Sequence, residues 1–365
     1  MGTATRPNRF LSRCICCAPA LGLGNGAMPR RNFLAGGIAA LGLGATAATL
    51  GAPAALAQAP ATKTRIDVHH HYVPPVHADA MATRRAGGRP PKWSPQMSLE
   101  EMDKSGIATA IVSLVQPATW FADDIALSRR ITRESNEYGA KMMQDHPGRF
   151  GLFAALALPD TEGSLKEIEY ALDTLKADGI GLMTSYGDKY LGNTSFEPVY
   201  AELNRRKALV YVHPTSPACC TKLDTGLSPG TVEYATDSTR TIGQLVISGT
   251  AAKFPDIRWI FSHSGGTLPF LTGRFIRLAA ERKLPDPLPA FRKFHYELAQ
   301  GNTPGQIAAL LKMVPISQVL YGTDYPFRGG AEVNAGIAAY GFGADDVRSI
   351  EREVATRLIP RLKAA

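Results

Sequence analysis

The sequence contains few cysteines, and their placement gives no sign of a disulfide-stabilised fold. Three of its five cysteines lie within the first 57 residues. The other two, Cys219 and Cys220, are adjacent, and adjacent cysteines rarely bridge each other without strain. Beyond residue 57 the chain also lacks internal repeats and low-complexity segments. These absences exclude a small disulfide scaffold, and they leave 308 residues that can bury a large core.

A strong net charge is also missing once the N-terminal segment is set aside. The whole chain has 40 basic and 32 acidic residues, a formal charge of +8. Residues 1–57 contain five arginines and no acidic residue, so the remainder has 35 basic and 32 acidic residues. This near balance gives no indication of nucleic acid binding.

The N-terminal segment has the pattern of a twin-arginine export signal. Arg30 and Arg31 precede a weakly hydrophobic stretch rich in alanine and glycine, and residues 55–57 (ALA) form a cleavage signal. We therefore expect a periplasmic or otherwise exported protein that begins at Gln58. A transmembrane anchor is the alternative interpretation, but the stretch is too weakly hydrophobic for a stable one.

The predicted organisation is one domain behind this signal. Residues 1–57 form the export signal, and residues 1–27 read as an upstream extension of it. Residues 58–64 form a short linker, and residues 65–365 form the domain. The domain has the length of a single (β/α)8 barrel.

The hydrophobic pattern also predicts this barrel. Apolar, β-branched runs alternate with helical patterns, which is typical of a parallel α/β fold. We expect residues 72–98 to form a long loop over the barrel mouth, Ser98 to cap the following helix, and His77 to lie at the surface. The predicted strands are 65–68, 108–114, 150–156, one that ends near residue 185, one that carries His213, one that ends at residue 263, 293–298 and 319–321.

Five residues suited to a metal site each lie at the end of a predicted strand: His69, His71, His213, His263 and Asp324. Barrels of parallel strands place their chemistry at the carboxyl ends of the strands. These positions therefore predict a shared metal site, whereas their spacing alone leaves zinc, manganese and iron open.

The first segment, DVHHH at residues 67–71, has an alternating geometry. Successive side chains of a strand point to opposite faces, so we expect His69 and His71 to share one face and His70 to take the other. Asp67 would share the face of His69 and could orient a ligand histidine from behind.

These segments resemble the amidohydrolase superfamily, in the branch of aminocarboxymuconate-semialdehyde decarboxylase. The resemblance runs from about residue 65 to residue 362. It includes WSP at 93–95 and its continuation at 99–107, KFPD at 253–256 and GTDYPF at 322–327. The resemblance implies that His69, His71, His213 and Asp324 are metal ligands. It further implies that His263 is an acid–base residue and that Asp324 is the other catalytic group, and it leaves open which of the two delivers the proton to the substrate.

A missing lysine bears on the number of metals. Many hydrolytic relatives hold two metals bridged by a modified lysine at the end of the fourth strand. The corresponding run at residues 179–186 (GIGLMTSY) contains no lysine. We therefore expect one divalent metal, with zinc preferred and manganese as the alternative.

The resemblance also implies a partner subunit. Arg274 corresponds to the family's arginine that reaches a neighbouring active site and binds a substrate carboxylate, which a guanidinium suits. This implies a homodimer; the alternative is a surface arginine on a helix. After His213 the chain reads PTSPACC, and this version looks closer to 6-methylsalicylate decarboxylase relatives.

The resulting hypothesis is a metal-dependent, non-oxidative decarboxylase (a carboxy-lyase) of a small aromatic or unsaturated carboxylic acid, such as 6-methylsalicylate. The runner-up is a hydrolase on the same fold, a lactonase or amidase, in which metal-bound water attacks a carbonyl. A third class is a non-catalytic extracytoplasmic binding protein, against which the complete ligand set argues.

Overall fold

The computed structural model describes residues 63–84, 89–120, 124–217, 220 and 226–364. The predicted export signal at residues 1–57, and most of the predicted linker at 58–64, lie outside these residues. None of the helices in the described ranges combines the length and the apolar character needed to cross a membrane.

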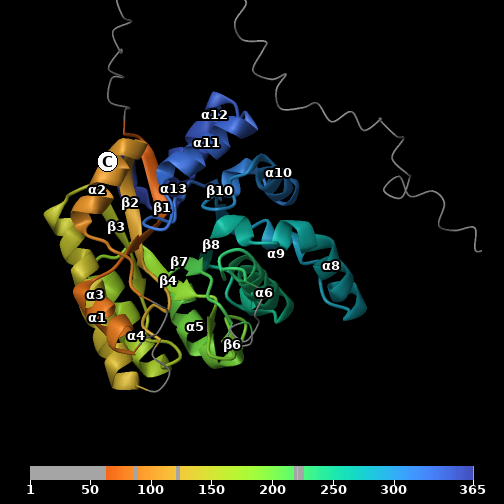
Figure 1. Cartoon of the computed structure of the whole chain (residues 1–365). Helices are drawn as coiled ribbons and strands as arrows, with labels where there is room; N and C mark the ends of the chain where they lie inside the picture. Colours follow the sequence, from red (N-terminus) through yellow and green to blue (C-terminus); the bar gives the residue numbers. More distant parts are fainter. Residues whose placement is uncertain (1–62, 85–88, 121–123, 218–219, 221–225, 365) are drawn as a thin grey trace, which may run out of the picture. The chain divides into compact units, whose positions relative to one another are not determined.

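Eight parallel strands form the central sheet, in the order β1-β2-β3-β4-β7-β8-β9-β10 (Figure 1). The first strand meets the last part of the sheet, because Val68 donates a backbone hydrogen bond to Tyr321, and His71 donates one to Tyr325. The predicted (β/α)8 barrel is therefore confirmed. The strands are β1 (Arg65–Tyr72), β2 (Ile107–Leu114), β3 (Phe150–Ala155), β4 (Gly179–Met183), β7 (Leu209–His213), β8 (Arg258–Phe261), β9 (His295–Glu297) and β10 (Val319–Leu320).

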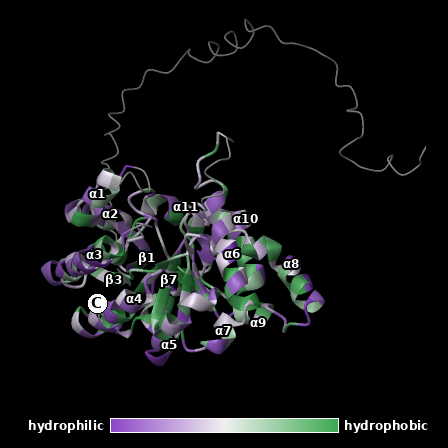
Figure 2. Ribbon diagram, turned by 90° about the horizontal axis from the view of Figure 1, so that it is seen from below, coloured by the Kyte–Doolittle hydropathy of each residue, from purple (hydrophilic) through white to green (hydrophobic). Residues whose placement is uncertain are grey.

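Helices follow the strands and cover the outside of the barrel, while a small hairpin of β5 (Ser185–Tyr186) and β6 (Lys189–Tyr190) follows β4. Figure 2 shows apolar residues concentrated on the central strands, and a mixture of polar and apolar residues on the outer helices. The helices are α1 (Pro75–Arg84), α2 (Pro95–Ser105), α3 (Ile125–Asp145), α4 (Thr161–Glu169), α5 (Glu197–Arg205), α6 (Glu233–Ile247), α7 (Thr250–Lys253), α8 (Leu268–Glu281), α9 (Leu288–Phe291), α10 (Pro304–Met313), α11 (Gly330–Tyr340), α12 (Ala344–Arg348) and α13 (Val354–Leu358).

The interior of the barrel holds an apolar cluster that is distinct from the one between the strands and the outer helices. Most strands contribute at least one inward-pointing side chain to it. Tyr211 of β7 stacks against Phe153 of β3 with ring centroids 5.2 Å apart. The C-terminal α13 contributes Leu358 to the same cluster, so this helix packs against the end of the barrel opposite the site residues. The remaining interior members include Ile66, Val68, Ile111, Leu209, Ile260 and Leu320.

The segment between β1 and β2 differs from the prediction. It contains α1, and α2 begins at Pro95 with Ser94 as its N-cap, whose side chain accepts a hydrogen bond from Met97. Serine followed by proline is a strong start signal, since proline fits the first helical position without loss of a hydrogen bond. Ser98 instead lies buried within α2 and is bonded to His70. His77 is also buried, with Nε2 2.6 Å from the carbonyl oxygen of Ala118.

Candidate metal centre

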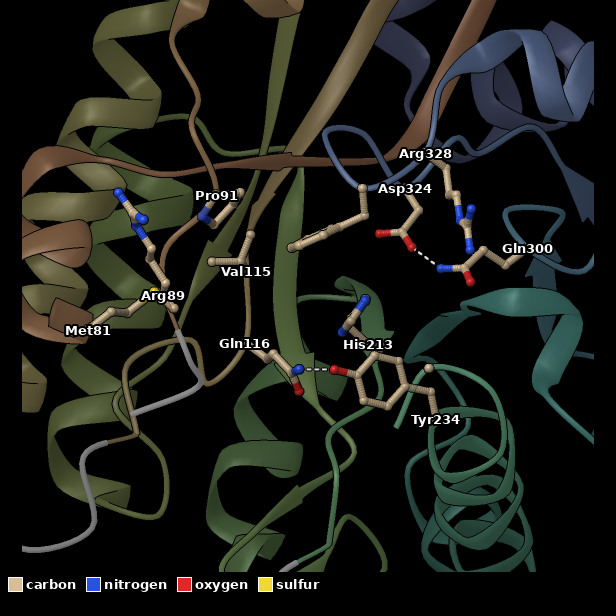
Figure 3. A pocket seen from close by; sticks show the side chains of 12 residues that line it. Met81, Arg89, Pro91, Val115, Gln116, His213, Tyr234, Gln300, Asp324 and Arg328 are labelled. Atoms are coloured by element: carbon tan, nitrogen blue, oxygen red, sulfur yellow. Dashed lines mark hydrogen bonds between the residues drawn. The ribbon is translucent and has the colours of Figure 1, made fainter. Parts of the chain in front are cut away.

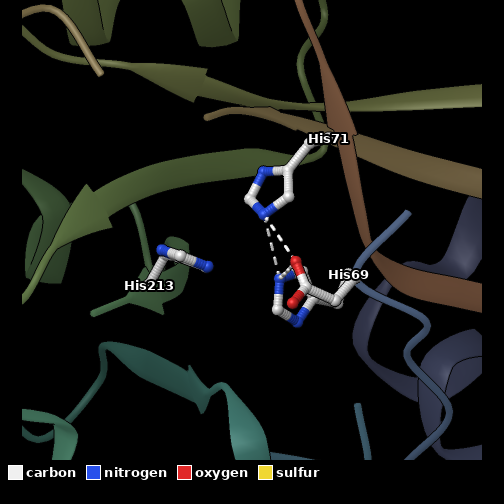
Figure 4. A group of neighbouring side chains, drawn as sticks. His69, His71 and His213 are labelled. Carbon is white, nitrogen blue, oxygen red and sulfur yellow. Dashed lines mark hydrogen bonds and ion pairs between the residues drawn. The ribbon is translucent and has the colours of Figure 1, made fainter. Parts of the chain in front are cut away.

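Three histidines and one aspartate converge at the carboxyl ends of the strands. His69 and His71 come from β1, His213 is the last residue of β7, and Asp324 follows β10. All four are buried, and one ligand atom from each lies within 4.8 Å of the others. Figure 4 shows the imidazoles turned toward a common point. The structure thus brings together all four residues that the sequence suggested as ligands.

The distances in this group fit a single small cation. The Nε2 atoms of His69 and His71 lie 3.1 Å apart, and Oδ1 of Asp324 lies 3.2 Å and 3.1 Å from them. Ligand atoms at about 2.1 Å from a common metal are separated by roughly 3.0–3.4 Å in octahedral or tetrahedral geometry. The group is therefore close to the shape that a divalent metal requires.

Each histidine turns its other ring nitrogen toward an acceptor. Nδ1 of His69 lies 2.8 Å from a carboxylate oxygen of Glu297. Nδ1 of His71 lies 3.3 Å from the carbonyl oxygen of Ser113, and Nδ1 of His213 lies 2.8 Å from that of Pro214. These acceptors place the hydrogen on Nδ1, so the lone pair of each ring is on Nε2 and faces the centre.

At least one atom at this centre has no hydrogen-bond partner within the described part of the chain. Nε2 of His213 is buried and unpartnered, and Oδ1 of Asp324 has the ring nitrogens of His69 and His71 as its polar neighbours. Buried polar atoms are normally satisfied, and lone pairs directed at one another repel. A divalent cation between them would satisfy all four groups, so the donor set fits the metal that the sequence predicted.

The ionisation of the three histidines is shifted by their surroundings. Burial lowers the pKa of His71, and it lowers the pKa of His213 well below its ordinary value with help from the neighbouring imidazoles. Burial alone would lower the pKa of His69 as well, but the carboxylates of Glu297 and Asp324 raise it to about 10. Without a cation, His69 is therefore protonated, and its positive charge lies between the carboxylates of Glu297 and Asp324.

His263 lies beside this group in a short helical turn after β8. Its Nε2 atom is 3.5 Å from Oδ2 of Asp324. Neither of its ring nitrogens has a hydrogen-bond partner among the described residues. Both His263 and Asp324 have positive φ values, 54° and 67°, in the left-handed region that most residues avoid. Strained positions of this kind are concentrated at functional sites.

Glu297 is a site residue that the sequence analysis missed. It is completely buried on β9 and accepts three hydrogen bonds, from Nδ1 of His69, from the backbone of His263 at 2.7 Å and from the backbone of Ala299 at 2.6 Å. The available signal was an acidic residue near the carboxyl end of a predicted strand, where an unpaired buried charge would be costly.

Asp67 does not have the expected role. The register of β1 against β2 is interrupted between Asp67 and His70. This irregularity brings His69 into the interior, where Val68 and Ile66 also lie, and turns Asp67 away. Asp67 bonds to Nδ1 of His70 at 3.0 Å and to the hydroxyl of Thr323 at 2.6 Å. It therefore stabilises the β1–β10 junction, and Glu297 takes the place behind His69.

A cavity of about 530 Å³ opens onto the group (Figure 3). His213 and Asp324 reach it from the metal side, and Phe327 lies above His71 with ring centroids 5.7 Å apart. Arg89 and Arg328 add positive charge to its lining. The other lining residues are Met81, Pro91, Val115, Gln116, Gly230, Tyr234 and Gln300.

The predicted substrate-binding arginine does not line the cavity. Arg274 is exposed on α8 and is not among the cavity-lining residues of the described chain. Its predicted role requires a second subunit. Cys220 is partly buried, whereas Cys219 lies outside the described residues.

Comparison with known proteins gives consistent matches over the barrel. The Amidohydrolase family matches residues 66–361. Decarboxylase yanB of Aspergillus niger is 37% identical, with 82% of this chain and 88% of that protein covered. A 6-methylsalicylic acid decarboxylase of Penicillium expansum is 33% identical, covering 82% and 97%. A crystal structure of a dihydroxybenzoic acid decarboxylase of Polaromonas with bound manganese superimposes with a TM-score of 0.73 at 21% identity, covering 83% and 98%.

Proposed function

Because this chain belongs to the amidohydrolase family, we propose that its metal-centred cavity catalyses the non-oxidative decarboxylation of a small aromatic carboxylic acid. The observation that carries this proposal is the buried group of three histidines and one aspartate, which opens onto a cavity with two arginines and an aromatic side chain in its lining. The curated relatives at 33–37% identity are decarboxylases.

The cavity suits a ligand of one aromatic ring with a carboxylate. Its volume of about 530 Å³ lies within the range of small-molecule sites. Val115, Met81 and Phe327 offer apolar contacts for a ring, while Arg89 and Arg328 complement a negative charge. The relative of Penicillium expansum is named for 6-methylsalicylic acid, and we propose an acid of this class as the substrate.

We propose that one divalent cation is held by His69, His71, His213 and Asp324. β4 contains no lysine that could bridge a second metal. Imidazole and carboxylate donors suit both zinc and manganese, and the Polaromonas enzyme contains manganese. When bound, the cation would hold the carboxylate of the substrate and a neighbouring hydroxyl, and it would offset their charge.

We assign the proton transfer to His263. Asp324 has one oxygen directed at the metal group and accepts a hydrogen bond from Gln300 on the other. His263, in contrast, is not one of the four grouped residues, and its Nε2 lies 3.5 Å from Oδ2 of Asp324, so a side chain suited to general acid–base catalysis stands beside the metal group. His263 delivers the proton to the ring carbon that bears the carboxylate. The bond to the carboxyl carbon then breaks, its electrons return to the ring, and carbon dioxide leaves.

We also propose a homodimer in which Arg274 acts on the neighbouring cavity. α8 carries this arginine and has an exposed apolar surface, since the Phe270 side chain is 87% exposed and Ile276 is 36% exposed. Phe270 lies four residues before Arg274, on the same face of α8, so a partner subunit that covers this face would contact both. An arginine from a partner would add a bidentate carboxylate contact to the site.

The test of the proposed function is a substrate screen of the metal-loaded enzyme with hydroxybenzoates and lactones. We expect a mass loss of one carbon dioxide from a hydroxybenzoate and no water uptake by a lactone. Hydrolysis of a lactone without decarboxylation of any acid would favour the hydrolase alternative, which only the family name supports. If the metal-loaded protein converts neither hydroxybenzoates nor lactones, the result would favour the non-catalytic binding protein.

A further inference from the structure

One side of the cavity is formed by a hydrogen-bonded pair, Gln116 and Tyr234. Gln116 follows β2, and Tyr234 lies in the first turn of α6. The side-chain amide of Gln116 donates a hydrogen bond to the hydroxyl of Tyr234 across the cavity lining (Figure 3). Two residues from distant parts of the chain thus fix the position of one phenol oxygen beside the metal group.

The Tyr234 hydroxyl is a donor that is still available. Its ring lies next to His213, with centroids 6.2 Å apart and planes at 70°. Burial, with a smaller contribution from the charge of Asp324, raises the pKa of Tyr234 to about 12, so the hydroxyl keeps its hydrogen near neutral pH. A hydroxyl can accept and donate hydrogen bonds at the same time. The amide of Gln116 donates to a lone pair of the Tyr234 oxygen and leaves the hydroxyl hydrogen unused. The described residues provide no acceptor for the remaining hydrogen.

We propose that Tyr234 donates this hydrogen bond to a ring hydroxyl oxygen of the bound aromatic acid, and that Gln116 positions Tyr234 for it. The inference rests on the proposed function and adds a specificity-determining residue to it: Tyr234 would favour acids with a hydroxyl on the carbon next to the one that bears the carboxylate. Such an oxygen lies beside the carboxylate, and hence beside His213 and the metal group. A donor placed to meet it discriminates strongly against an analogue that lacks the oxygen, because the donor is then left unpaired.

The experiment compares the binding of salicylate and benzoate, which differ in this hydroxyl alone, to metal-loaded protein by calorimetry. In Tyr234→Phe we expect salicylate to bind about tenfold more weakly, the usual scale for a lost hydrogen bond to a charged or polar partner. Benzoate should change less than about twofold, because it makes no such bond. Gln116→Leu should reduce the preference for salicylate in the same direction but less, since the phenol stays present without its positioning partner.

Tyr138→Phe is the matched control, because it removes a hydroxyl from a tyrosine of α3 that packs on Trp93 and does not line the cavity. It should bind both acids as the wild type does. An equal change for the two acids, or no change, in both Tyr234→Phe and Gln116→Leu at unchanged metal content would overturn the inference while leaving the proposed function in place. Wild-type protein that binds neither acid would overturn both.

Discussion

Oε1 of Glu297 lies 2.8 Å from Nδ1 of His69, and neither side chain is exposed to solvent. The same carboxylate oxygen accepts the backbone hydrogen of His263. Glu297 thus connects a residue of the metal group to the backbone that carries the proposed proton donor. Residues behind a metal ligand fix its orientation and its basicity.

The first prediction is that Glu297→Gln weakens metal binding by about 10–100-fold, the usual effect of changing such a partner. Both oxygens of Glu297 accept hydrogens, so an amide nitrogen at either position would face another donor. Metal affinity is measured by competition with a chelator. Glu351→Gln is the matched control, since this poorly exposed carboxylate pairs with Arg65 at 2.7 Å and takes no part in the site. Equal metal affinity in Glu297→Gln and wild type would contradict the assigned role.

The second prediction concerns pH. The carboxylates around His69 raise its pKa to about 10, so the metal-free protein holds a proton there at neutral pH. The metal needs the neutral imidazole and must displace this proton. Apparent metal affinity should therefore rise with pH, by about tenfold per unit between pH 6 and pH 8. Chelator competition at three pH values checks this, and an affinity that stays constant over the range would show that no proton is displaced.

The third prediction separates a ligand from an acid–base residue. His263→Asn should retain the metal and lose about 10²–10⁴-fold in turnover, the usual contribution of general acid–base catalysis. His213→Asn should instead lose metal, because its Nε2 faces the centre without another partner in the described chain. Elemental analysis and turnover are measured on both variants. Loss of metal from His263→Asn would make His263 a ligand, and two metals per wild-type chain would contradict the single-metal site.

The fourth prediction tests the dimer. Arg274→Ala should keep the metal and bind substrate more weakly. If the arginine acts across the dimer, mixing Arg274→Ala and His263→Asn chains should create hybrids with one intact site. At a substrate concentration too low for Arg274→Ala to turn over, random exchange would restore about one quarter of the wild-type activity. Sedimentation verifies that dimers form, and a mixture no more active than its components would place Arg274 outside the partner's cavity.

The fifth prediction concerns export. Replacing Arg30 and Arg31 by lysine should retain the precursor inside the cell, because the twin-arginine pair is the recognised part of the signal. N-terminal sequencing of the exported wild-type protein should begin at Gln58. Fractionation that finds the double variant outside the cell, at the wild-type level, would mean that the arginine pair is not read as a signal.

The sequence predicted the barrel and the four converging residues because both depend on local patterns. A β-branched run followed by a histidine at a strand end is visible in the chain itself, as at His213. The face of Asp67 could not be predicted, since the irregularity in β1 depends on its pairing with β2. Glu297 and His77 are buried through partners far away in the sequence, namely His69 and Ala118. Their roles follow from the tertiary contacts alone.

The closure of the barrel also sets the time at which the protein can acquire its metal. His69 and Asp324 lie 255 positions apart, and they meet only where β1 joins the chain after β10. At ordinary rates of synthesis, roughly 13 to 50 seconds separate the appearance of the two residues on the ribosome. A growing chain can therefore offer a metal at most part of its donor set. Full metal loading must be one of the last events in the biogenesis of this protein, after the ribosome has released nearly the whole barrel.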